Sequence, residues 1–284
     1  MHIAETVASV RERVAQLRAQ GRSVALVPTM GALHEGHLAL IRAAGEDGSA
    51  VIVSVFVNPT QFNDAADLAK YPRDPQADAA LAAQAGADTV FLPSVEEVYP
   101  SGFSTSIRVS GVSELWEGAT RGASHFDGVA LVVTKLFLMV GPDNAWFGAK
   151  DAQQVAVVRR AVADLNIPVA VRTMATVRAQ NGLALSSRNQ RLRPEDQPAA
   201  LSLSASLRSA QESAAAGMLD AAWLARRGEA SLAEAGARVE YWAVVEPLTL
   251  EPLERLVPGE PALAIVAAWV GDVRLIDNAQ LLAP

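Results

Sequence analysis

Short apolar runs alternate with segments of helical periodicity through the first two thirds of the chain. Five of these runs have the length of buried strands, and they lie at residues 24–27, 51–57, 89–92, 145–147 and 169–173. Between them, apolar residues recur at helical spacing over residues 75–85, 128–140 and 151–164. Because crossover helices join parallel strands, this alternation predicts an α/β domain, a parallel sheet with helices on both faces.

The pattern changes in the last third of the chain. Two alanine-rich helical segments and two strands are predicted there, at residues 199–216, 220–235, 239–245 and 262–269. Gly217 separates the two helices, and a chain reversal near Gly271 fits a turn between antiparallel strands. The sequence therefore predicts a first domain over residues 1–180 and a smaller α+β domain over residues 181–284.

The first 20 residues carry valine and leucine at the spacing of an amphipathic helix, with charged residues between them. They contain no apolar block and no cleavage site, so no signal peptide is expected. The most apolar stretch, residues 129–140, is far shorter than the roughly 20 residues needed to cross a bilayer. We therefore expect a soluble, cytoplasmic protein that does not span a membrane.

The composition excludes several classes of protein. Half of the 284 residues are hydrophobic (50%) and 19% are charged, which excludes intrinsic disorder. The net charge of −7, without a cluster of lysine and arginine, argues against nonspecific nucleic-acid binding, and no nucleic-acid partner is expected. The absence of cysteine excludes disulfides, thiolate nucleophiles and iron–sulfur clusters, so any metal would bind oxygen or imidazole.

The first segment that carries chemistry follows the strand at residues 24–27. A turn containing Gly31 leads into His34-Glu35-Gly36-His37, after which a helix is predicted. A turn between a strand and a helix N-terminus presents free N–H groups and a positive dipole end, and nucleotide-binding α/β folds bind phosphate there. A metal site or a structural histidine pair that caps the helix are the alternatives.

The second segment follows the strand at residues 51–57. Ligands of open α/β sheets bind at the carboxyl ends of the strands, where this strand delivers Asn58 and Gln61. Their amides suit the hydroxyl and carboxylate groups of a small substrate. A polar turn without a ligand is the alternative interpretation.

Two further segments carry cationic side chains. Lys150 stands at a predicted helix start, where a cation opposes the helix dipole, so its presence suggests a bound anion; Asp151 is an ordinary first-turn residue. Ser186, Ser187 and Arg188 combine two hydroxyl groups with a guanidinium, the set that phosphate oxygens prefer. A surface lysine and a serine-capped turn are the alternatives.

Taken together, these segments resemble the pantoate–β-alanine ligase family. The resembling stretches are residues 28–37, 57–62, 71–73, 147–154, 182–189, 267–269 and 275–278, in family order. The His-x-Gly-His signature is shared by many nucleotidylyl transferases and class I aminoacyl-tRNA synthetases. The Asn-Pro-x-Gln-Phe and Ser-Ser-Arg-Asn motifs are specific, and the resemblance covers essentially the whole chain.

The resemblance implies a Rossmann-like domain that binds ATP and pantoate, a smaller C-terminal lid domain, a homodimer and the use of Mg²⁺. The implied reaction has two steps. The pantoate carboxylate first attacks the α-phosphorus of ATP, giving pantoyl adenylate and pyrophosphate. The amine of β-alanine then displaces AMP and forms pantothenate.

The resemblance also implies residue roles. His34, His37 and Lys150 are the expected catalytic residues, with Lys150 as the cation beside the α-phosphorus, where charge develops in the transition state. The residues expected to bind ATP are Met30, His34, His37, Gly148, Lys150, Asp151, Ser186, Ser187 and Arg188. The residues expected to bind pantoate are Gln61, Gln154 and Asn58.

Asp78 matches a family position near the metal. Ala77 and Leu81 stand where relatives can carry polar ligands, so Mg²⁺ is expected to be held mainly by ATP oxygens and water.

Three departures from the family pattern concern the pocket. Ala149 replaces the usual glutamate, Asn181 replaces an aspartate, and residues 121–126 form a longer loop without the usual proline. The reach of Arg121 and the choice of acid substrate are therefore open. A different adenylate-forming enzyme and a nonenzymatic nucleotide-binding relative are the competing interpretations, and ATP–pyrophosphate exchange separates them from the ligase.

Overall fold

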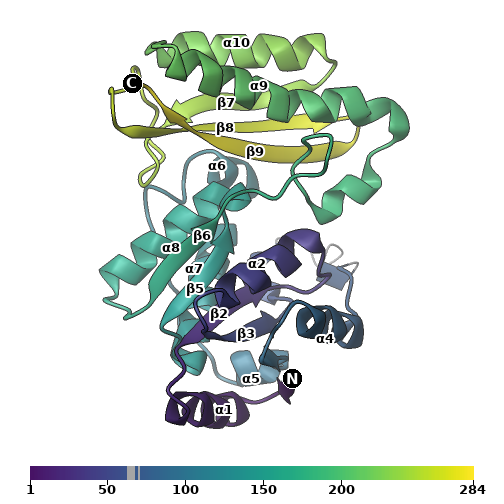
Figure 1. Ribbon diagram of the computed structural model, residues 1–284, viewed down its shortest axis with the longest axis vertical. Coiled ribbons are helices and arrows are strands. Elements are labelled where there is room, and N and C mark those ends of the chain that lie inside the picture. Colours follow the sequence, from purple (N-terminus) through teal and green to yellow (C-terminus); the bar gives the residue numbers. More distant parts are fainter. Residues whose placement is uncertain (63–67, 70) are drawn as a thin grey trace. The chain divides into compact units, whose positions relative to one another are not determined.

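The computed structural model describes residues 1–62, 68–69 and 71–284 (Figure 1). The chain divides into two compact units: Met1–Gly148 with Val157–Ala175 form the first, and Ala149–Ala156 with Thr176–Pro284 form the second. We expected the boundary after residue 180 and placed residues 149–156 in the first domain. In the structure this short stretch packs against β9 of the second unit, because Asn278 hydrogen-bonds its backbone.

The first unit is built on a parallel sheet, as the alternating pattern predicted. Within the described residues it has six strands in the order β1-β4-β3-β2-β5-β6. The strands are β1 (His2–Ala4), β2 (Val24–Thr29), β3 (Ala50–Val55), β4 (Thr89–Phe91), β5 (Asn144–Gly148) and β6 (Ala170–Met174). The strand order reverses at β2, which pairs with β3 on one side and β5 on the other.

Helices flank this sheet, as expected for the fold class. They are α1 (Val7–Ala19), α2 (Glu35–Gly45), α4 (Pro75–Gln84), α5 (Val95–Val98), α6 (Glu117–Arg121), α7 (Ala123–Val140) and α8 (Ala152–Asp164). Side chains of α2 and α4 share a core with alternate residues of β2 and β3, such as Val27 and Val53. Helices α1 and α7 pack against each other and against β2. No helix within the described ranges is long and apolar enough to cross a membrane.

The second unit is a three-stranded antiparallel sheet with two long helices. Its elements are η2 (Ala149–Asp151), η3 (Ser187–Arg191), η4 (Pro194–Asp196), α9 (Gln197–Ala215), α10 (Ala221–Glu234), β7 (Arg238–Val245), β8 (Pro261–Val270) and β9 (Val273–Leu282). The predicted α+β character is confirmed. The strand β9 was implied by the turn at Gly271 but its extent was not predicted.

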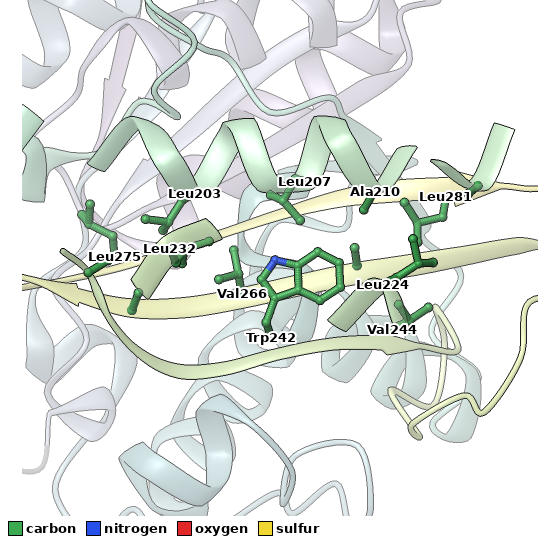
Figure 2. Close-up of a cluster of buried hydrophobic side chains, with 14 of the residues drawn as sticks. Leu203, Leu207, Ala210, Leu224, Leu232, Trp242, Val244, Val266, Leu275 and Leu281 are labelled. Carbon is green, nitrogen blue, oxygen red and sulfur yellow. The ribbon is translucent and has the colours of Figure 1, made fainter. Parts of the chain in front are cut away.

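Trp242 of β7 lies in the middle of the core of the second unit (Figure 2). Leucines of α9 and α10 surround it, including Leu207 and Leu224, and its ring nitrogen donates to the Ser206 hydroxyl at 3.1 Å. Helix α10 comes so close that a Cβ on Gly228 would lie 2.4 Å from the Trp242 ring. This tight packing fixes the sheet whose edge strand, β9, carries polar residues of the candidate site.

Candidate active site

The loop between β2 and α2 presents the two histidines. It turns through Gly31 (φ +83°) and Ala32 (φ +51°), two successive residues in the left-handed region. The Thr29 hydroxyl donates to the Ser54 carbonyl at 2.8 Å and accepts the Gly31 N–H at 3.2 Å, so the loop is tied to the neighbouring strand β3. A left-handed conformation at a residue with a Cβ is strained and persists only where neighbouring contacts hold it.

Asp78 provides the contacts that stabilise this left-handed turn. It lies in the first turn of α4, it is 4% exposed, and its two carboxylate oxygens accept the N–H groups of Ala32 (3.0 Å) and Leu33 (2.8 Å). A Cβ on Gly31 would lie 2.7 Å from the same carboxylate, so only glycine allows this approach. The residue expected near a metal therefore fixes the loop that carries the histidines.

His34 and His37 form the N-terminal cap of α2. Nδ1 of His34 accepts the Gly36 N–H at 3.2 Å, and Nδ1 of His37 accepts the His34 N–H at 3.3 Å. The ring centroids are 4.1 Å apart. Because Nδ1 of each ring is an acceptor, the proton of the neutral imidazole sits on Nε2. The pair thus caps the helix and is held as Nε2–H donors, so the capping and phosphate-binding interpretations are compatible.

In the segment that follows β3, Asn58 fixes the position of Gln61 through a side-chain hydrogen bond. It is fully buried (0% exposed), and its amide nitrogen donates to the Gln61 side-chain oxygen and to the Gly128 carbonyl, both at 3.1 Å. Its amide oxygen accepts from the Tyr99 hydroxyl at 2.9 Å and from Thr60. Burial raises the pKa of Tyr99, which keeps this hydroxyl a donor. With its hydrogen-bonding groups engaged, Asn58 orients Gln61, which is only partly buried.

Helix α7 holds the same turn from the other side. The His125 ring lies 3.1 Å from the Gln61 carbonyl through Nδ1, and a Cβ on Gly128 would lie 2.4 Å from the Thr60 carbonyl oxygen. The sequence pattern indicates no role for His125 or Gly128. Arg121, whose reach was open, forms an ion pair with the buried Glu117 at 2.9 Å.

The cationic residues lie in the second unit. Lys150, Ser186 and Arg188 line one pocket together with Asp277 of β9. Among the described residues, no carboxylate oxygen lies within 4.0 Å of the Lys150 ammonium. The Ser186 hydroxyl accepts the Arg188 N–H at 3.3 Å, which closes the short turn η3. Within this unit the structure thus brings Lys150, Ser186 and Arg188 together, as expected for a site that binds a polyanion, whereas Ser187 is exposed and does not line the pocket.

The remaining expected residues divide between the units. In the first unit, Met30 directly follows β2 and Gly148 is the last residue of β5. Both lie at the carboxyl edge of the parallel sheet. Gln154 belongs to the first turns of α8, counted with the second unit, and Asp151 beside it is exposed. Each unit therefore carries its own group of candidate residues.

No group of three or more histidine, aspartate and glutamate side chains that could hold a metal is found in the part of the chain that the structure describes. Each Asp78 carboxylate oxygen already accepts a backbone N–H. The described residues therefore do not form a protein cage for Mg²⁺.

A parallel sheet whose switch point presents two histidines at a helix N-terminus defines a nucleotide-binding α/β protein of the His-x-Gly-His class. Comparison with known proteins narrows this class. A family model described as pantoate-beta-alanine ligase matches residues 2–280, and the chain belongs to that family.

Individual relatives agree with the family model over the full chain. The pantothenate synthetase of Moorella thermoacetica is 49% identical over 282 residues, 99% of both chains. That of Thermus thermophilus has a crystal structure with a TM-score of 0.90 at 46% identity, covering 99% of this chain and 100% of that one. A ligase from Francisella tularensis, solved with a β,γ-ATP compound and β-alanine, has a TM-score of 0.77 at 33% identity, covering 98% of this chain and 97% of that one.

Proposed function

We propose that the protein condenses pantoate with β-alanine in an ATP-dependent reaction that passes through pantoyl adenylate. The observation that carries the proposal is the loop between β2 and α2, where the backbone holds His34 and His37 as donors at a helix N-terminus. The family match over residues 2–280 supports the identity of the two substrates.

In the first step, a carboxylate oxygen of pantoate attacks the α-phosphorus of ATP, and the bond to the β-phosphate oxygen breaks. His34 and His37 donate from Nε2 to phosphate oxygens, and the α2 dipole adds to their effect. Lys150 neutralises the charge that develops on the α-phosphoryl group and on the departing pyrophosphate. Ser186, Ser187 and Arg188 bind the β- and γ-phosphates.

In the second step, the amine of β-alanine attacks the acyl carbon, AMP leaves and the nitrogen loses a proton as the amide forms. Gln61 and Gln154 hold the pantoate hydroxyl and carboxylate groups, and Asn58 acts by orienting Gln61. Met30 lines the nucleotide pocket, and Gly148 and Asp151 face the ribose.

Removing the Gln61 amide should weaken pantoate binding more than ATP binding. We expect Gln61→Ala to raise the KM for pantoate about tenfold, the effect of one or two lost hydrogen bonds, with the KM for ATP nearly unchanged. Steady-state kinetics with each substrate varied in turn measures both constants. Gln84→Ala is the control, since it removes an exposed side-chain amide of the same unit, at the end of α4, away from the Asn58 turn. Equal changes in the two KM values would contradict the assignment.

The order of the two steps has its own test. With pantoate present and β-alanine absent, labelled pyrophosphate should exchange into ATP, because the first step is complete without the amine. A ligase using an acyl phosphate would release ADP instead, and direct condensation would show no exchange without β-alanine. Several short hydroxy acids should be compared with pantoate. Exchange driven by another acid would identify a different adenylate-forming enzyme, and no exchange in protein that binds ATP would favour a nonenzymatic relative.

We also propose that ATP is used as its Mg²⁺ complex, that the protein is a homodimer and that it works in the cytoplasm. Mg²⁺ keeps several waters and binds readily to substrate phosphates, which suits a site without a protein cage among the described residues. Family resemblance supports the dimer, and the need for ATP supports the compartment. The Mg²⁺ dependence of pyrophosphate exchange tests the use of the Mg²⁺ complex, and light scattering tests the dimer.

A further inference from the structure

Lys150 lies in the three-residue turn η2, between the end of β5 and the start of α8. So short a turn has little internal hydrogen bonding to fix it. The side-chain amide of Asn278, from β9, donates to the carbonyl oxygens of Ala149 at 2.9 Å and of Lys150 at 2.8 Å. One nitrogen with two N–H groups thus binds two successive carbonyls of the turn that carries the lysine.

Asn278 is itself fixed. It is 8% exposed, its backbone N–H donates to Asp277 Oδ1 at 2.8 Å, and its carbonyl accepts from the Arg178 guanidinium at 3.4 Å. Asp277 is 4% exposed, and Arg178 binds both of its oxygens, at 2.6 and 3.0 Å. A bidentate pair with a buried carboxylate holds its geometry better than a single surface ion pair.

The Arg178 guanidinium is also linked to the Ser-Ser-Arg segment, through the hairpin that precedes this segment. Arg178 also donates to the Gly182 carbonyl at 3.2 Å, inside a hairpin in which Arg178 pairs with Ala184. Asn189, directly after the Ser-Ser-Arg motif, donates its amide to the Ala184 carbonyl at 2.9 Å. The polar cluster Arg178–Asp277–Asn278 therefore connects the Lys150 turn with the loop that carries Ser186 and Arg188, and these segments line the same pocket.

We propose that Asn278 is a positioning residue for Lys150: its amide holds the Ala149–Lys150 backbone so that the ammonium meets the α-phosphoryl group, and the Arg178–Asp277 pair holds Asn278. The inference rests on the proposed function. Asn278 does not touch the substrate in this account and acts only through Lys150. Misplacement of Lys150 should therefore affect the chemical step more than substrate binding.

The test is single-turnover formation of pantoyl adenylate. Asn278→Ala removes both N–H donors, and we expect the rate to fall about tenfold, with the apparent affinities for ATP and pantoate changing less than about twofold. Asn278→Asp keeps the shape of the side chain but places carboxylate oxygens against two carbonyls, so its rate should fall at least as far. Thermal unfolding identifies any variant that fails to fold.

Gln211→Ala is the matched control. The Gln211 amide, from α9, donates to the Gln280 carbonyl at 3.0 Å, two residues further along β9. This variant loses an amide-to-carbonyl bond on the same strand without touching the Lys150 turn, and its rate should stay within about twofold of wild type because distant, independent sites do not couple.

A double-mutant cycle separates positioning from general stabilisation. If Asn278 acts through Lys150, then Asn278→Ala in a Lys150→Ala background should cost less than about twofold, since the group it positions is gone. Losses that multiply, or a wild-type rate for Asn278→Ala alone, would overturn the inference. Failure of the wild-type protein to exchange pyrophosphate with any acid would instead overturn the proposed function, and this inference with it.

Discussion

Replacing Lys150 with alanine should lower the rate of pantoyl adenylate formation by at least about a hundredfold, because removing one preorganised donor to a developing anion typically costs roughly 3 kcal/mol. The side chain lines a pocket with Ser186 and Arg188, and no described carboxylate lies within ion-pair distance of its ammonium. Its charge is therefore available to an anion. The effect should appear mainly in the rate of the chemical step.

Rapid-quench measurement of adenylate in a single turnover, on protein shown to be folded, tests this expectation. Arg193→Ala is a suitable control, because it removes one positive charge from the same unit at an exposed residue paired with Asp196. Its rate should stay close to that of the wild type. A Lys150→Ala rate near the wild-type value would remove Lys150 from the mechanism.

The periodic parts of the fold were predictable because burial on a sheet or helix face leaves a repeating trace in the sequence. The five runs expected as parallel strands correspond to β2 through β6, and both alanine-rich helices of the second unit were found. The strand β1, at His2–Ala4, was missed because it lies within the first 20 residues, whose valines and leucine follow helical spacing, and because Ile3 is its only large apolar side chain. The boundary between the units could not be predicted from the sequence. It depends on the side-chain amide of Asn278, which hydrogen-bonds the carbonyls of residues 149 and 150 and so joins them to the second unit.

The candidate site divides in the same way. Side chains directly after strands, such as His34, Gln61 and Lys150, could be chosen from their position alone. The residues that hold them come from distant parts of the chain: Asn278 lies 128 residues from Lys150, and Gly128 lies 70 residues from Asn58. Such support leaves no local pattern. Asn278 stood within a recognised motif, but only the structure indicates what its amide binds.

Asp78 is the site residue whose interpretation changed most, and its replacement should have the second large effect. We expect Asp78→Ala to lower the free energy of unfolding by about 3 kcal/mol, because two N–H groups lose a buried charged acceptor. The Gly31–Ala32 turn, in which both residues have positive φ, also loses the hydrogen bond that stabilises it. Chemical denaturation of the variant and the wild type measures the loss.

Asp74→Ala is the matched control for stability. Asp74 caps the same helix, α4, and accepts the Ala77 N–H at 2.9 Å without touching the loop before α2. Loss of an N-cap costs about 1 kcal/mol. The control should therefore lose less stability than Asp78→Ala and keep the adenylation rate of the wild type.

The isosteric Asp78→Asn variant decides between the two interpretations of Asp78. An amide can accept one of the two backbone N–H groups, but its own N–H groups then face the other, so the loop and the histidines on it should shift. If Asp78 acts on the loop, the adenylation rate should fall about tenfold or more at any Mg²⁺ concentration, because misplaced histidines no longer orient the phosphate groups for reaction. A metal ligand behaves differently, because excess Mg²⁺ compensates for weaker binding by mass action. Restoration of the wild-type rate at high Mg²⁺ would therefore return Asp78 to the metal site, whereas a loss that Mg²⁺ does not restore assigns it to the loop.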